Sequence, residues 1–199
     1  MTYICFIKQQ KLNQMKTLNH SKKISSTIAM LFIACASFSQ INKLSAEKYV
    51  DANSKITSVA ESEKFLWIGT NNGVVRVSKK NEKIIHFNVS NSKLPSNDVT
   101  SICVRKDGNV WIGTTNGILR YDQFAYVIVN TENSLLSENK ITSIVEDKNN
   151  DLWIGTHTGL VRVHNSKFQV FNQKNSPSLA SDNIVSLSTD ESGNLCINK

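Results

Sequence analysis

From residue 56 to residue 199, short runs of apolar and β-branched residues alternate with polar clusters rich in Asn, Asp and Gly. Within one stretch of this pattern the apolar runs cover residues 99–104, 110–114, 118–121 and 125–129. Runs of this length, bounded by turn residues, are typical of β-strands, and Asp-Gly or Asn-Gly clusters supply the positive φ that tight hairpins need. The pattern therefore predicts an antiparallel meander of four strands.

The meander is repeated along the chain. The sequence Leu/Val-Trp-Ile-Gly-Thr occurs three times, with its tryptophans at positions 67, 111 and 153, a spacing of 44 and then 42 residues. A period in the low forties, built from short strands, indicates small sheets packed face to face, most often as a β-propeller. We predict an all-β, incomplete propeller with three complete four-stranded blades and a partial fourth, at about residues 56–98, 99–140, 141–183 and 184–199. A further strand is expected near residues 47–51.

The repeated motif has a sufficient structural explanation. Its strand is apolar on both sides, as expected for an inner strand that is covered on each face. The Trp supplies a large apolar surface and an N–H that can reach a backbone carbonyl, and the Gly permits close approach of a neighbouring blade. We therefore interpret six motif residues as structural and not as a site: Trp67, Gly69, Trp111, Gly113, Trp153 and Gly155.

Residues 1–39 have the composition of a secretory signal peptide. They contain five lysines and no acidic residue, followed by an apolar stretch at 24–36 and then small residues. About 13 apolar residues are too few to span a bilayer, which takes about 20. Met15 is an alternative start, and Cys35 in Phe-Ile-Ala-Cys offers an alternative lipoprotein site. Export to the periplasm or the cell surface is expected, with residues 40–199 as the mature region and no spanning helix beyond the signal segment.

The net charge changes once this segment is set aside. The whole chain carries +7, but the 18 basic and 16 acidic residues that follow residue 39 leave only +2. A strongly basic chain would suggest a nucleic-acid partner. The excess charge lies in the targeting segment, so no nucleic-acid partner is expected.

Candidate catalytic and metal-binding patterns are weak. Asp147-Lys-Asn-Asn-Asp151 opens like a calcium loop, but Leu152 and Thr158 stand where that loop needs Gly and an acidic residue, so a hairpin turn is the better interpretation. The cysteines outside the leader, Cys103 and Cys196, have no disulfide or metal-ligand spacing. No nucleophile–base arrangement stands out, so neither an enzyme nor a cofactor is expected.

Three arginines occupy one repeat position: Arg76, Arg120 and Arg162. Equivalent guanidinium groups could bind an anionic glycan or a carboxylate in a bidentate manner. Each could equally be an outward strand residue that packs its apolar stem and pairs with a neighbouring acid. The sequence leaves both interpretations open.

Residues 109–121, Asn-Val-Trp-Ile-Gly-Thr-Thr-Asn-Gly-Ile-Leu-Arg-Tyr, together with the link Leu-Pro-Ser-Asn-Asp-Val at 94–99, resemble the two-component regulator propeller repeat. The resemblance extends over about residues 56–197. It implies the periplasmic sensor portion of a bacterial hybrid histidine kinase, responding to polysaccharide breakdown products ahead of a membrane helix and a kinase. No spanning segment or kinase signature follows the repeats here.

The leading expectation for function is a non-catalytic, extracytoplasmic sensor fragment whose ligand is an oligosaccharide. The alternative is a secreted or surface interaction module that completes its propeller with another chain, and a propeller-type lyase is a distant third. Because propellers close with about 4–8 blades, we expect a truncated front end of a longer sensor, or otherwise a genuine short secreted protein. Its apolar blade faces, around Trp67 at one end and around Trp153, Leu187 and Leu195 at the other, would favour self-association.

Overall fold

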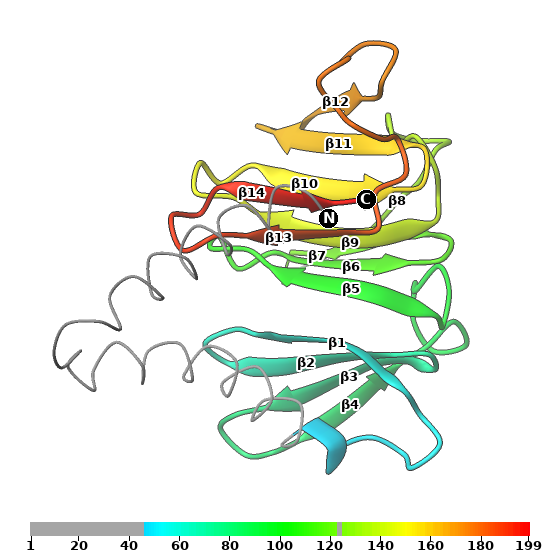
Figure 1. The fold of residues 1–199 in the computed structure, drawn as a ribbon. Coiled ribbons are helices and arrows are strands. Elements are labelled where there is room, and N and C mark those ends of the chain that lie inside the picture. Colours follow the sequence, from blue (N-terminus) through cyan, green and yellow to red (C-terminus); the bar gives the residue numbers. More distant parts are fainter. Residues whose placement is uncertain (1–45, 123–124) are drawn as a thin grey trace, which may run out of the picture. The chain divides into compact units, whose positions relative to one another are not determined.

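The computed structural model describes residues 46–122 and 125–199, so the predicted signal peptide lies outside the described residues. The described chain forms four antiparallel sheets whose strands follow chain order (Figure 1). Sheet 1 comprises β1 (Ile56–Glu61), β2 (Phe65–Thr70), β3 (Gly73–Ser78) and β4 (Ile84–Phe87). Sheet 2 comprises β5 (Val99–Val104), β6 (Val110–Thr114), β7 (Gly117–Tyr121) and β8 (Tyr126–Val129). Sheet 3 comprises β9 (Ile141–Glu146), β10 (Leu152–Thr156), β11 (Gly159–His164) and β12 (Lys167–Phe171). Sheet 4 comprises β13 (Ser186–Thr189) and β14 (Leu195–Asn198).

The first strands of successive sheets lie beside one another: β1 contacts β5, β5 contacts β9, and β9 contacts β13. Apolar side chains fill the space between each pair of sheets, which gives one cluster for sheets 1 and 2 and another for sheets 2 and 3. The predicted fold class, three four-stranded blades and a partial fourth in an open propeller, is confirmed.

The motif glycines mark the closest approach of consecutive sheets. A Cβ on Gly69 would lie 2.7 Å from Val99 Cγ1, and one on Gly113 would lie 2.7 Å from Ile141 Cγ2. Val99 and Ile141 each begin the first strand of the following sheet. Since real Cβ contacts are longer than 3.0 Å, these positions admit only Gly unless the neighbouring Val99 or Ile141 side chain shifts.

A serine hydroxyl links consecutive first strands. Ser58 Oγ accepts a hydrogen bond from the Ile102 N–H, and Ser101 Oγ accepts one from the Ile144 N–H, both at 3.0 Å. The register of β1 against β2 shifts next to Ser58, and that of β5 against β6 shifts next to Ser101, as expected for a β-bulge that redirects a side chain. The hydroxyl of Ser143, at the same place in sheet 3, is buried and has no partner among the described residues.

The links between sheets are more regular than a polar stretch suggests. The Asn88 N–H donates to Asn91 Oδ1, and the Asn91 N–H donates to Asn88 Oδ1. The same reciprocal pair forms between Asn130 and Asn133 and again between Asn172 and Asn175. Asn side chains that bond nearby backbone groups fix turns in this way. Sequence reasoning missed this element, although the spacing Asn-x-x-Asn-Ser recurs in every link.

Two expectations about the ends of the array were wrong. Residues 46–50 form a short helical turn and not a strand. Ala46, Tyr49 and Val50 pack against Ile68 and Val75, on the face of sheet 1 that does not meet sheet 2. Trp67 is therefore not at an open face: it points toward sheet 2 and is 2% exposed.

Candidate functional site

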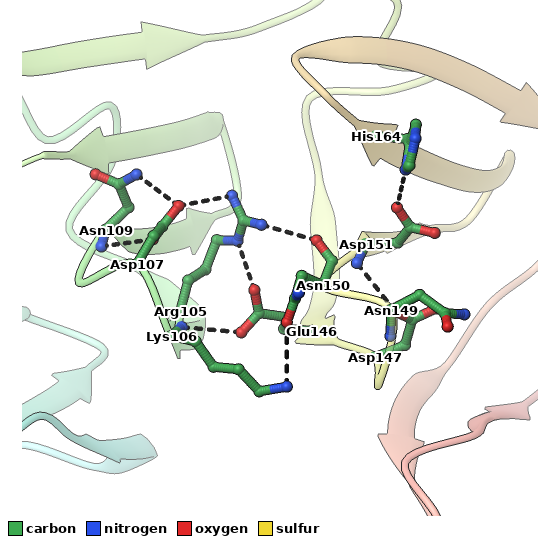
Figure 2. Close-up of polar contacts among 10 residues, drawn as sticks. All are labelled: Arg105, Lys106, Asp107, Asn109, Glu146, Asp147, Asn149, Asn150, Asp151 and His164. Atoms are coloured by element: carbon green, nitrogen blue, oxygen red, sulfur yellow. Dashed lines mark hydrogen bonds and ion pairs between the residues drawn. The ribbon is translucent and has the colours of Figure 1, made fainter.

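The hairpin turn at Asp147–Asp151 holds its own carboxylate. Asp147 Oδ1 accepts hydrogen bonds from the N–H groups of Asn149 and Asp151, at 2.8 and 3.0 Å (Figure 2). Its other oxygen accepts a bond from Trp153 Nε1 at 2.9 Å. These bonds use the Asp147 carboxylate within the turn, in agreement with the hairpin interpretation. Within the described residues, no group of three or more His, Cys, Asp or Glu side chains is placed to hold a metal ion.

The Trp153 contact corrects the expectation that the motif tryptophans reach backbone carbonyls. Trp153 reaches a carboxylate, whereas the indole N–H groups of Trp67 and Trp111 are buried without a hydrogen-bond partner in the described part of the chain. The difference follows from the residue six places before the Trp: it is Asp147 in sheet 3, but Arg105 in sheet 2 and Glu61 in sheet 1. Sheet 4 has Asp190 at this position, with Cys196 in place of the Trp.

Arg105 joins the turns of sheets 2 and 3. Its Nε donates to Glu146 Oε1 at 3.0 Å, and its terminal nitrogen donates to the Asn150 carbonyl at 2.8 Å (Figure 2). The Lys106 N–H donates to the other oxygen of Glu146. The Glu146 side chain is 8% exposed, so its charge is paired where water is largely excluded. Both Glu146 oxygens and the Asn150 carbonyl already accept hydrogen bonds within the protein, which favours a role in fixing the two sheets.

The three candidate arginines lie on the third strands, each directly opposite the motif Trp of its own sheet. Their guanidinium carbons lie 5.4 Å (Arg76), 6.0 Å (Arg120) and 5.7 Å (Arg162) from the centroids of the paired Trp rings. This is cation–π distance. Each arginine belongs to a different sheet, and each has its own set of neighbours.

Arg162 has an acidic partner in its own sheet. Its Nε donates to Asp151 Oδ2 at 2.8 Å, and a terminal nitrogen donates to the same oxygen. His164 Nδ1 lies within hydrogen-bond distance of the other oxygen, Oδ1. Burial, the largest influence, acts to raise the pKa of Asp151, but the hydrogen bonds from His164 and Arg162 outweigh it and hold the pKa below its ordinary value of 3.8.

Arg120 has a looser acidic neighbour. A terminal nitrogen lies 3.8 Å from Asp122 Oδ2, two residues further along the chain. Arg120 Nε is buried and has no hydrogen-bond partner among the described residues. The pair is partly exposed, so its contribution to stability is expected to be small.

Arg76 has a third kind of environment, made of aromatic rings. Its guanidinium carbon lies 4.6 Å from the centroid of Phe65, 5.3 Å from Phe87 and 5.9 Å from Tyr121. Tyr126 completes the group: its ring stacks on Tyr121 at 4.8 Å and lies 6.3 Å from Phe87. Among the described residues Arg76 has no hydrogen bond and no acidic partner. We call these residues the aromatic seam: Phe65, Trp67, Arg76, Phe87, Tyr121 and Tyr126.

Two groups near these clusters have shifted pKa values. Burial is the main cause that raises the pKa of Tyr126, and the nearby Arg76 charge opposes the shift. The Tyr126 phenol is therefore protonated at neutral pH and can donate a hydrogen bond. Burial also raises the pKa of the Cys103 thiol to about 12, which leaves it protonated and unreactive at neutral pH.

Comparison with known families places these features in context. The sequence profile of the two-component regulator propeller family matches residues 93–116 and 135–158, which include the motif strands of sheets 2 and 3. The chain contains two-component regulator propeller repeats. A comparison with curated protein sequences gave no match.

Solved structures agree with the family. The extracellular domain of a protein described as a hybrid two-component system of B. thetaiotaomicron is 31% identical, with a TM-score of 0.61, over 72% of this chain and 20% of that one. The extracellular domain of a second B. thetaiotaomicron system, described as one-component, is 25% identical, with a TM-score of 0.60, over 74% of this chain and 20% of that one. The chain thus spans about a fifth of the length of each of these two relatives.

An enzyme shares the fold. A virginiamycin B lyase from Staphylococcus aureus is 17% identical, with a TM-score of 0.55, over 74% of this chain and 50% of that one. At this identity the likeness shows the fold alone, because one propeller architecture hosts unrelated functions. In the described part of the chain, no helix has the length and hydrophobicity that crossing a bilayer requires.

Proposed function

We propose that this chain is an extracytoplasmic, non-catalytic propeller portion of a two-component signalling system and that it binds a glycan. The observation that carries the proposal is the pair of B. thetaiotaomicron extracellular domains, which share both the fold and 25–31% of the sequence. The signal-peptide composition of residues 1–39 supports export. A half-buried aromatic surface with a charged group, such as the aromatic seam, suits a sugar ring, since binding sites combine apolar walls with a few polar groups.

The test uses the exported protein, purified from the periplasm or culture medium. Binding is measured by isothermal titration calorimetry with galactotriose as a neutral oligosaccharide and trigalacturonate as an acidic one. Chromatography of the same mixtures after long incubation detects any cleavage. Saturable binding of either sugar without new products supports the proposal, whereas product formation, or no heat with both sugars, would contradict it.

A second function is favoured by one observation: sheet 4 has two strands where the other sheets have four. Val185 and Ile197 are 49% and 36% exposed there, and the outer edge of β14 has no strand beside it in the described chain. Exposed edges with apolar residues pair readily with further strands. We propose that β14 is a site of self-association or of pairing with another chain.

Light scattering tests this second proposal. The parent should form dimers or larger species at micromolar concentration, and Ile197→Lys should shift it toward monomer because a charged edge residue opposes strand pairing. Ser188→Lys on β13 is the matched control and should leave the association unchanged. A monomeric parent would count against a self-associating edge.

A further inference from the structure

The internal repeats show what an arginine at this position normally meets. In sheet 3 the acid comes from Asp151, at the start of the second strand, and in sheet 2 it comes from Asp122, after the third strand. The residues of sheet 1 at these two repeat positions are Phe65 and Ser78. Neither residue carries a negative charge. Sheet 1 therefore has no acidic residue at either of the positions that supply one in sheets 2 and 3.

The arginine itself is retained and remains accessible. Arg76, Phe65, Phe87 and Tyr126 are all half-buried, while Trp67 beneath them is buried. Removing a charged group from water is unfavourable unless a partner compensates it. Cation–π contacts with Phe65 and Phe87 supply part of that compensation, but they leave the in-plane N–H donors of the guanidinium without acceptors among the described residues.

A carboxylate on a ligand could accept hydrogen bonds from the Arg76 guanidinium. Arg162 already binds a carboxylate, that of Asp151, at the equivalent position of sheet 3. Guanidinium and carboxylate form charge-assisted, often bidentate, pairs. Beside Arg76, the half-buried Tyr126 ring offers aromatic surface that can face a sugar ring, and its hydroxyl can donate a hydrogen bond to the sugar.

Building on the proposed function, we propose that the aromatic seam binds a uronic acid residue, with Arg76 pairing its carboxylate and Phe87 and Tyr126 lying against the ring. The seam is a binding site between sheets 1 and 2. It is distinct from the equivalent arginine positions in sheets 2 and 3, whose guanidinium groups have acidic neighbours of their own.

Titration calorimetry with trigalacturonate and its neutral methyl ester tests the role of the charge. The exported protein should bind the acid about 10- to 100-fold more tightly than the ester, the range expected for one charge-assisted pair. Arg76→Met keeps the length of the side chain and should abolish this preference. Arg76→Lys should restore part of it, because lysine keeps the charge but not the bidentate geometry. Arg120→Met, at the same position of sheet 2, is the matched control and should keep the preference.

A purely structural Arg76 predicts a different result. In that case Arg76→Met would lower the denaturation midpoint while the acid-to-ester ratio stayed as in the parent, which would overturn the inference. Equal binding of acid and ester by the parent would also overturn it. Binding of neutral galactotriose without binding of the acid would remove the uronate site and leave the proposed glycan function intact. Absence of binding to all these sugars would remove both.

Discussion

The contact between Gly113 and Ile141 gives the sharpest test of how the sheets stack. Gly113→Ala places a methyl group 2.7 Å from Ile141 Cγ2, 3.1 Å from Ile144 Cδ1 and 3.2 Å from Ile141 Cβ. Ile141 is fully buried, so neither its side chain nor the added methyl of residue 113 can move into solvent. Overpacking of a well-packed core costs about 1–3 kcal/mol, and we expect Gly113→Ala to lower the free energy of unfolding by that amount.

A second substitution identifies the atom responsible. Ile141→Leu conserves volume but removes the Cγ2 methyl that lies nearest to the added Cβ, and by itself it should cost less than about 1.5 kcal/mol. In the double variant the new methyl of residue 113 gains room. The double variant should therefore lose less free energy of unfolding than the two single variants together, by about 0.5 kcal/mol or more, as is found for residues in direct contact.

The measurement is urea denaturation followed by tryptophan fluorescence, with the free energy of unfolding obtained by linear extrapolation. Ile184→Leu is the matched control, because Ile184 is equally buried but faces Gly155 instead of Gly113. Its combination with Gly113→Ala should be additive. If the Gly113 and Ile141 substitutions were also additive, sheets 2 and 3 would not be in the contact described, and the reasoning on blade stacking would fail.

Three further predictions concern single residues. Trp111→Ala should cost about 3–5 kcal/mol in urea denaturation, since it removes a buried ring between sheets 2 and 3; an unchanged midpoint would contradict its burial. Asp151→Asn should destabilise the protein at pH 6. The difference from the parent should shrink as the pH falls below 3.8, the ordinary pKa of the group, and vanish once the pH is below its lowered pKa in the folded protein, because the carboxylate stabilises the fold only while ionised. At pH 7.5 iodoacetamide should label Cys196 much faster than Cys103, whose thiol is buried with a pKa raised to about 12; equal rates by mass spectrometry would contradict this.

The strands could be predicted because their signal is local. The four strands of sheet 2 lie within a residue or so of the apolar runs, and the turn at Asn116-Gly117 needs the positive φ of 107° that Gly adopts readily. The repeat strengthened the prediction, because the same pattern of strands and turns appears in each copy. Fold class therefore followed from the sequence with little ambiguity.

Contacts between sheets carry no such local signal. The register of a strand sets which residues share its face, but not which segment covers that face. Trp67 was expected at an open end for this reason, although the neighbour of its face is sheet 2, and residues 46–50 cover the opposite face. The partner of Trp153 Nε1 depends on Asp147, six residues away along a hairpin, whose carboxylate is held by the turn itself.

The arginine positions show where function can be sought in a repeated fold. Trp and Gly recur in all three complete sheets because each sheet must pack on the next, and such residues report on architecture. Each arginine recurs too, but its neighbours differ: aromatic rings around Arg76, Asp122 beside Arg120, and Asp151 with His164 around Arg162. Packing does not require these differences, since all three arginines lie against a Trp in the same geometry. A charged residue that recurs in the repeats, but has an acidic partner in only some of them, is therefore a better candidate for ligand binding than the motif Trp or Gly. Within the described residues, Arg76 is the arginine that meets this condition most fully.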